Sequence, residues 1–166
     1  MTLTAHALGG AATALVLRAH PVAGLCAAFT SHFILDAVPH WDHPLRSLVK
    51  HPENYMEDRL NFRNPKLVRD VIDTAIDGLL GLAAVGVAIA LTHPQHLSLA
   101  LTGAALGIFP DALQVLYFAA PRSPLRHLQR LHRICHAKTN FDRRPQIGVP
   151  MQLIFAGLLV AVIAIL

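Results

Sequence analysis

The sequence predicts an all-α integral membrane protein, a bundle of about five transmembrane helices joined by two basic cytoplasmic loops. First, 54% of the 166 residues are apolar and only 14% are charged, against roughly 25% charged in ordinary soluble domains. Second, most charged residues fall in two segments, whereas a soluble helical protein needs charges on the outer face of each helix. Third, several apolar runs approach the roughly 20 residues needed to span a bilayer.

Five apolar segments make up this predicted single domain, and in chain order they cover residues 5–17, 21–38, 71–92, 97–120 and 147–166. The first is short for a span, so it is expected to tilt, to be partly re-entrant or to extend through the preceding residues. Helix is the expected state throughout, because backbone groups in lipid must be satisfied within the segment. In the fourth segment, Gly103 and Gly107 have the GxxxG spacing that permits close helix packing.

The positive residues predict the orientation. Thirteen of the fourteen Lys and Arg residues lie in the loops after the second and fourth segments, and only Arg18 falls on the other side. By the positive-inside rule these loops and the N-terminus are cytoplasmic, and the C-terminus is outside. The high pI then reflects topology and contact with anionic lipids. Nucleic-acid binding is not expected, because no stacking aromatic residues alternate with the basic ones.

Ionisable residues inside the apolar segments are costly and usually mark a functional path. With alternating spans, those of this chain converge on the predicted cytoplasmic leaflet. They are His6 in the first segment, His32 and Asp36 in the second, Asp73 and Asp77 in the third, and Asp111 in the fourth. Leftover polar residues would scatter between both ends, so this convergence predicts a site.

Three pairs of ionisable residues have i, i+4 spacing, which places both side chains on one helical face. They are His32 with Asp36, Asp73 with Asp77, and, in the basic segment after the fourth span, His132 with His136. Imidazole and carboxylate ligands together suit one or two ions of Zn²⁺ or Mn²⁺. Water activated by such an ion would be a hydrolytic nucleophile. The predicted metal ligands are His6, His32, Asp36, Asp77 and Asp111, and the predicted catalytic groups are Asp73, as ligand or base, and His40.

The basic segment after the fourth span is the predicted substrate-binding element. Its arginines have helical spacing, so a surface helix on anionic lipid is the simplest interpretation. The functional alternative is a clamp on a phosphate group. The residues assigned to this clamp are Arg126, Arg130, Arg133, His132 and His136.

Short motifs in this chain resemble the membrane-bound metal-dependent hydrolases, a family of small bacterial inner-membrane proteins. The motifs are His6, Ser31-His32 with Asp36, the run from Gly107 to Pro110-Asp111, and the run from His132-Arg133 to His136. The Ser-His-x-x-x-Asp element comes second here, whereas the family places it late, and no Asp-His follows Asp111. The resemblance implies a multi-pass protein of the bacterial inner membrane with metal-dependent hydrolase activity.

The leading hypothesis is therefore a membrane-embedded, metal-dependent hydrolase that acts on a lipid-linked substrate, with a phosphoester as the candidate bond, from the cytoplasmic leaflet. A transporter for a metal ion or a proton is the first alternative, although it predicts charges through the full membrane thickness. A haem protein is suggested by the eleven histidines. A membrane scaffold without catalysis is the last alternative. Membrane lipids are expected partners, and the sequence is compatible with an oligomer.

Overall fold

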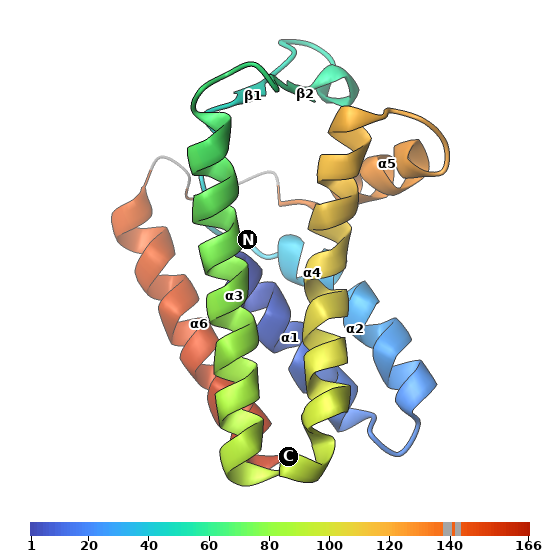
Figure 1. The fold of residues 1–166 in the computed structure, drawn as a ribbon, viewed down its shortest axis with the longest axis vertical. Coiled ribbons are helices and arrows are strands. Elements are labelled where there is room, and N and C mark those ends of the chain that lie inside the picture. The colour runs from blue at the N-terminus through green and yellow to red at the C-terminus, as the bar shows by residue number, and fades with distance from the viewer. Residues whose placement is uncertain (138–140, 142–143) are drawn as a thin grey trace.

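The computed structural model describes residues 1–137, 141 and 144–166 (Figure 1). Lys138 and Arg143, two of the positive residues used to predict the orientation, lie outside the described part. The chain is mostly helical, with a short two-stranded ribbon. The elements are α1 (Leu3–Val16), α2 (Pro21–Asp36), β1 (Leu48–Val49), the 3₁₀ turn η1 (Tyr55–Glu57), β2 (Arg59–Leu60), α3 (Leu67–Thr92), the 3₁₀ turn η2 (Pro94–His96), α4 (Leu97–Ala119), α5 (Leu125–Cys135) and α6 (Pro145–Ile165).

Each of the five predicted apolar segments forms a helix, but the helices differ in length. In the described part of the chain, three are long and apolar enough to cross a membrane: α3, α6, and α4 together with η2. The other two, α1 and α2, have 14 and 16 residues, so at 1.5 Å per residue each is only about 20–25 Å long. The structure therefore supports a multi-pass membrane protein in which α1 and α2 form a shorter hairpin.

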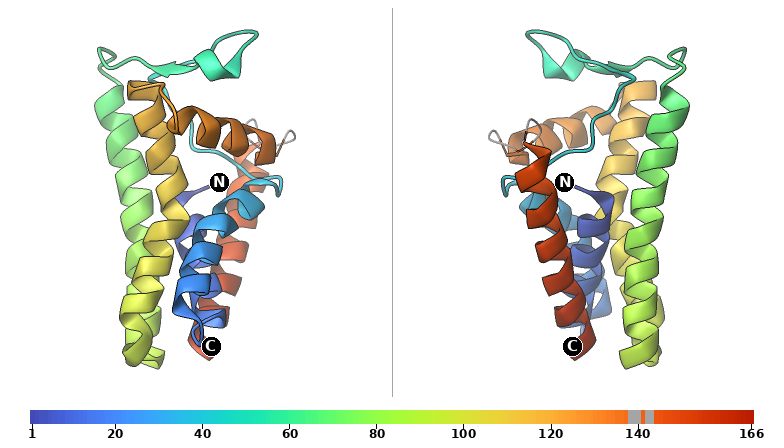
Figure 2. Two further views of the ribbon diagram at one scale, coloured as in Figure 1. Left: turned by 90° about the vertical axis from the view of Figure 1, so that its right-hand side faces the viewer. Right: turned by 90° about the vertical axis from the view of Figure 1, so that its left-hand side faces the viewer.

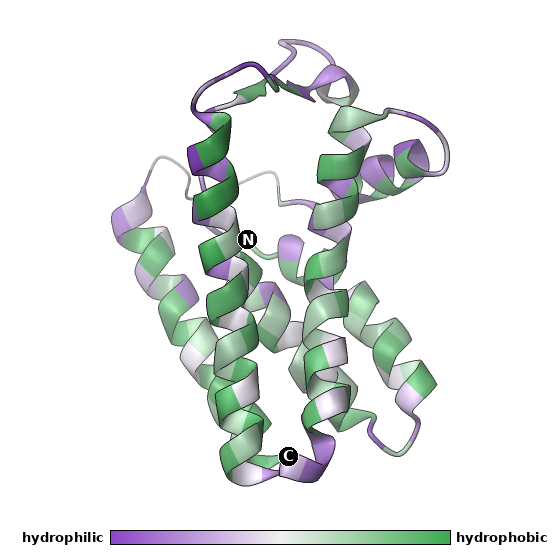
Figure 3. Cartoon of the chain, in the orientation of Figure 1, coloured by the Kyte–Doolittle hydropathy of each residue, from purple (hydrophilic) through white to green (hydrophobic). Residues whose placement is uncertain are grey.

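The distribution of apolar side chains supports this conclusion. Large apolar residues face outward along the long helices, with Leu79 and Leu91 of α3 exposed by 64% and 80% and Ile154 of α6 by 66%. Apolar surface of this extent is costly in water and is expected in lipid. Hydrophilic residues instead gather in the β1–β2 ribbon and along α5, at one end of the bundle (Figure 3).

Helix α1 occupies the centre of the bundle, where α2, α3, α4 and α6 surround it (Figure 2). Glycines allow α1 and α4 to pack backbone to backbone. A Cβ atom added to Gly103 would lie 2.6 Å from the Ala14 Cβ and 2.8 Å from the Gly10 carbonyl oxygen, and one added to Gly107 would overlap the His6 carbonyl oxygen. The predicted GxxxG pair thus permits the closest helix contact of the core.

Two elements cover the hydrophilic end of the bundle. The β1–β2 ribbon, with Leu48 paired to Leu60, is attached to α3 because the Ser47 N–H and hydroxyl both donate to the Asp70 carboxylate at 2.7 Å. Helix α5 runs across the bundle beside the upper part of α4, above the N-terminus and the end of α2 (Figures 1 and 2). The ribbon and α5 therefore enclose the region where the ionisable residues of α1, α2 and α4 meet.

Candidate metal centre

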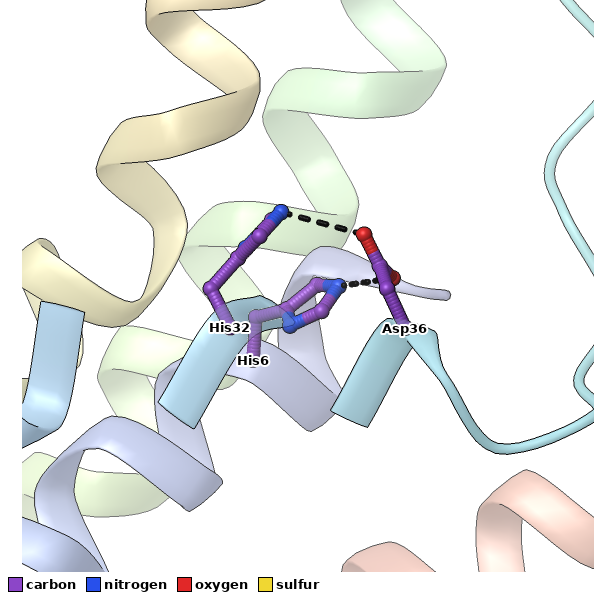
Figure 4. A group of neighbouring side chains, drawn as sticks. All are labelled: His6, His32 and Asp36. Carbon is purple, nitrogen blue, oxygen red and sulfur yellow. Dashed lines mark ion pairs between the residues drawn. The ribbon is translucent and has the colours of Figure 1, made fainter. Parts of the chain in front are cut away.

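Four helices bring a group of histidine and aspartate side chains together around Asp36, the last residue of α2. The Asp36 Oδ1 lies 3.1 Å from the His6 Nε2. Its Oδ2 lies 3.2 Å from the His32 Nε2 and 2.9 Å from the His132 Nε2. Both the His6 and the His32 rings point toward this carboxylate (Figure 4). Asp111 of α4 joins at 3.6 Å from the His32 Nε2 and 3.7 Å from the His132 Nε2.

These side chains are buried, yet several of their polar atoms lack hydrogen bonds. His6 and His32 are fully buried, and Asp36 is 1% exposed. Within the described part of the chain, the His6 nitrogens, the His32 Nε2 and the Asp36 Oδ2 have no hydrogen bond of acceptable geometry. Buried polar atoms are rarely left in this state, because each costs about 1–3 kcal/mol. These unpaired atoms therefore suggest that the cluster binds a ligand.

A metal ion could pair with these atoms, because the imidazole nitrogens and the carboxylate oxygens lie close together around a common point and do not form hydrogen bonds with good geometry. Two ligands at tetrahedral positions, each about 2.0–2.1 Å from zinc, are about 3.3 Å apart. The separations of Asp36 from His6 and His32, 3.1 and 3.2 Å, are close to this spacing. His6, His32 and Asp36 form one group whose ligand atoms all lie within 4.8 Å of one another, and His32, Asp111 and His132 form another.

Hydrogen bonds at the far side of the ring fix the tautomer of His32. Its Nδ1 lies 2.9 Å from the Gly107 carbonyl oxygen. A carbonyl can only accept, so Nδ1 carries the proton and Nε2 presents a lone pair to the cluster. Metal-binding histidines are commonly oriented in this way. The glycine has two functions here, since its lack of a side chain lets α1 approach and its carbonyl orients the ring.

A third group lies beside the first two, in the segment that follows α2. The His40 Nε2 is 3.0 Å from the Asp42 Oδ1, and the His136 Nε2 is 3.2 Å from the Asp42 Oδ2. His40 also approaches the Asp36 Oδ1 at 3.9 Å, and Asp36, His40 and His136 form a potential metal-binding group. The cluster around Asp36 thus continues toward the end of α5.

The two outer members of this third group, Asp42 and His136, bind each other electrostatically. Burial opposes ionisation of Asp42, but the hydrogen bond from His136, the nearby His40 ring and the positive N-terminus outweigh it and hold the pKa of Asp42 below its ordinary value. The same bond to Asp42 raises the pKa of His136 above its ordinary value. The N-terminal ammonium also lies 2.7 Å from the Asp42 Oδ1, so this carboxylate already has a cation beside it.

The structure does not bring Asp77 into the cluster. Its carboxylate lies at the N-terminus of α1, where it accepts from the Leu3 N–H at 2.6 Å and from the Thr4 hydroxyl at 2.7 Å. These are the unpaired donors that begin a helix, and a carboxylate also suits the positive end of the helix dipole. The prediction of Asp77 as a metal ligand is therefore replaced by a capping role.

Asp73, predicted as ligand or base, is also outside the cluster. Its Oδ2 lies 3.1 Å from the Arg46 Nη1 and 3.7 Å from the Arg69 Nε. Arg46 also contacts Asp70 at 3.2 Å, so these acids attach the ribbon segment to the start of α3. The i, i+4 spacing of Asp73 and Asp77 did not predict these arginine contacts. Such a spacing shows that two side chains share a helix face, but not which residues that face contacts.

The predicted substrate-binding residues fall on two faces of α5. His132 is 4% exposed and points into the cluster, as described above. Arg126, Arg130 and Arg133 lie on the exposed face. His136, just beyond the helix, belongs to the third group. The simple surface-helix interpretation therefore describes the arginines, whereas the two histidines face the candidate metal centre.

Asp42 was not predicted as a site residue, although it lies between His40 and Trp41 on one side and His43 on the other. Its position depends on contacts distant in sequence. The Phe141 N–H donates to the His40 carbonyl at 2.8 Å, and the Gln152 side-chain amide donates to the Trp41 carbonyl at 2.6 Å. In the sequence, only the high density of His and Asp in residues 40–43 indicated that Asp42 belongs to the site.

An apolar crevice of about 480 Å³ is lined by residues of α1, α2 and α6. Gly9, Ala12 and Thr13 of α1 line it, with Leu159 of α6 and several residues of α2. Among the latter are Ser31 and Leu35, the residues directly before His32 and Asp36. The crevice is open toward the outer surface, where Thr30 and Ile34 are exposed.

Searches for related proteins returned no matching family model, no matching curated protein and no matching solved structure. The assignment of function therefore depends on the chemistry of the cluster and its surroundings.

Proposed function

We propose that this chain is a membrane-embedded, metal-dependent hydrolase that acts on a lipid-linked substrate, with a phosphoester as the favoured bond. The observation that carries the proposal is a set of converging buried atoms around Asp36. Among the described residues, the His6 nitrogens, the His32 Nε2 and the Asp36 Oδ2 of this set have no hydrogen bond. Residues with both imidazole and carboxylate donors favour Zn²⁺ or Mn²⁺. An ion bound there would polarise the bond to be broken and make a water more acidic.

The individual side chains then have distinct functions. His6, His32, Asp36 and His132 would hold the ion, since their atoms lie closest together and are almost fully buried. Asp111 differs from them, because its side chain is 26% exposed and it lies 3.6 Å or more from the nearest imidazole nitrogen. Its partial exposure gives this carboxylate access to water. Asp111 is therefore the carboxylate that orients the attacking water and accepts its proton.

The surroundings support a lipid-linked substrate. The apolar crevice has the volume and lining to hold part of a hydrocarbon chain, and two of its lining residues, Ser31 and Leu35, directly precede His32 and Asp36 in α2. The exposed arginines of α5, Arg126, Arg130 and Arg133, flank the same end of the bundle and would attract an anionic headgroup. A phosphoester between the two would bring its headgroup to the metal and its chain to the crevice.

By the positive-inside rule, the cluster would then open to the cytoplasmic side of a bacterial inner membrane, with the N-terminus on that side. The transport alternative has less support. Beyond His6, the buried residues of α1 are alanine, glycine and leucine through Leu15. In the described part of the chain, the cluster does not continue through this core as a polar path, which a carrier for ions or protons would need.

The proposal is tested with the full chain in lipid nanodiscs loaded with Mn²⁺ or Zn²⁺, by mass spectrometry of phosphate or headgroup release from a panel of phospholipids and polyprenyl phosphates. Asp36→Asn should lose both the bound metal and activity. Asp111→Asn should keep the metal and lose at least about a hundredfold in kcat, the usual contribution of a general base.

Asp73→Asn is the matched control, because Asp73 is an acid at the same end of the bundle that lies outside the cluster. It should retain both metal and activity. Wild-type turnover in Asp36→Asn, or absence of metal from well-folded wild-type protein after loading, would overturn the proposal.

A further inference from the structure

We propose that the cluster binds two metal ions bridged by Asp36, with the second ion held by His40, Asp42 and His136. This inference rests on the proposed function and specifies its metal centre. The first ion would occupy the space between His6, His32, Asp36 and His132. The second would occupy the adjoining third group, which comes from the segment after α2 and from the end of α5.

The two oxygens of Asp36 face different sets of imidazoles. Its Oδ2 faces His32 at 3.2 Å and His132 at 2.9 Å, whereas its Oδ1 faces His40 at 3.9 Å. The Oδ1 lies nearer to His6, at 3.1 Å, and to the N-terminal ammonium, at 3.3 Å, than to His40, so this oxygen lies between the two groups. A carboxylate placed in this way can give one oxygen to each of two ions, which is the usual means of holding a pair of ions about 3.5–4 Å apart.

The second group has its own complete set of donors. Asp42 offers Oδ1 toward His40 at 3.0 Å and Oδ2 toward His136 at 3.2 Å. With Asp36 Oδ1, this makes two nitrogen and two carboxylate ligands, a set that suits zinc or manganese. The Asp42 Oδ1 also accepts from the N-terminal ammonium at 2.7 Å, so the ion would displace the ammonium from this oxygen. His40, Asp42 and His136 are not part of the first group, and Asp36 is the one shared residue. An ion bound in one group therefore does not take these ligands from the other.

The His40 ring is oriented for this purpose. Its Nδ1 lies 2.6 Å from the Val38 carbonyl oxygen, which can only accept, so the proton is on Nδ1. The His40 Nε2 is buried and, among the described residues, has no hydrogen bond of acceptable geometry. An imidazole lone pair aimed into a buried carboxylate cluster, with its other nitrogen tied to the backbone, is the arrangement expected of a metal ligand.

Charge also favours two ions over one. The carboxylates of Asp36, Asp42 and Asp111 lie within one cluster, and buried negative charges require nearby cations. The N-terminal ammonium, 3.3 Å from the Asp36 Oδ1 and 2.7 Å from the Asp42 Oδ1, adds one positive charge. With neutral histidines, a single divalent ion then leaves the cluster with no net charge to attract a phosphoester. Two divalent ions leave a net positive charge and hence a position for an anionic group.

The two positions differ in access to water. The side chains of Asp42 and His136 are 31% and 19% exposed, whereas those of His6 and His32 are fully buried. The second ion is therefore expected to exchange more readily than the first and to lie on the side from which a headgroup enters.

Metal stoichiometry tests this inference on the full chain in detergent, loaded with excess Mn²⁺ and freed of unbound ions before elemental analysis. Wild type should hold two ions per chain, and both Asp42→Asn and His136→Ala should hold one. His127→Ala is the matched control, since this histidine is on the exposed face of the same helix, and it should hold two.

Electron paramagnetic resonance of Mn²⁺-loaded wild type gives a second readout that needs no variant. Two ions bridged by a carboxylate should show an exchange-coupled spectrum, and His136→Ala should return the spectrum of an isolated ion. One uncoupled ion in wild type, unchanged in the Asp42 and His136 variants, would overturn the second site and leave the proposed function intact. Absence of any bound metal would overturn both.

Discussion

The two ends of α1 make contacts of opposite kinds, one apolar and closely packed and the other polar. Toward the end of α1, Gly10, Ala14 and Gly103 meet with no polar side chain between them, in contacts so close that a single added Cβ has no room. One to two turns earlier, His6 meets His32 and Asp36, and the space between the helices contains polar atoms without hydrogen bonds.

The difference shows how a polar cluster can be held ready inside an apolar bundle. Close packing of small residues needs nothing but the helices themselves, so it sets the separation and register of α1 and α4. The buried carboxylate and imidazoles are costly in the absence of an ion. The packed region therefore supplies the stability that allows the cluster to persist in an arrangement suited to a ligand.

The largest effect is expected from a change in the packed region. Gly103→Leu would place a Cβ 2.6 Å from the Ala14 Cβ and 2.8 Å from the Gly10 carbonyl oxygen, and would force α1 away from α4. We expect a loss of about 3 kcal/mol in the free energy of unfolding, the upper range for overpacking, measured by thermal unfolding in detergent. Gly157→Leu is the control, since a Cβ at Gly157 meets nothing within 4 Å. Equal midpoints for the two variants would contradict the comparison.

An intermediate effect is expected from metal at the cluster. At a free Mn²⁺ concentration about a hundredfold above Kd, binding stabilises the folded state by about 2.7 kcal/mol, which for a chain of this size raises Tm by roughly 5–10 °C. Chelation should reverse this gain in wild type and in Gly157→Leu. In Asp36→Asn, which lacks the shared carboxylate of the cluster, Mn²⁺ and chelator should give the same Tm. A full shift in that variant would place the metal elsewhere.

The smallest effect is expected in the apolar crevice. Thr30→Trp would fill its open side and should raise KM for a long-chain lipid substrate about tenfold, the equivalent of about 1.4 kcal/mol. The kcat and KM for a short-chain, water-soluble analogue should stay unchanged. Leu79→Trp, at an exposed position on α3 away from the crevice lining, should behave as wild type. Equal loss on both substrates would show that the crevice does not hold the chain.

The helical, membrane-spanning character of the chain followed from local features. Long runs of alanine and leucine in a setting that demands internal hydrogen bonds have no stable alternative to helix, and the five predicted segments each appear as a helix. The pairing of His32 with Asp36 was also local, because i, i+4 spacing places both on one face, and their 3.2 Å contact confirms it.

The membership of the cluster was decided by tertiary structure. Asp77 and Asp36 look equally suitable in the sequence, yet Asp77 caps α1 and Asp36 meets three histidines. Likewise, His132 became a cluster residue because α5 folds across the bundle, while Asp42 was placed by contacts with residues about a hundred positions away. The spacing along a helix determines which side chains share a face, whereas only the packing of the helices determines what that face meets.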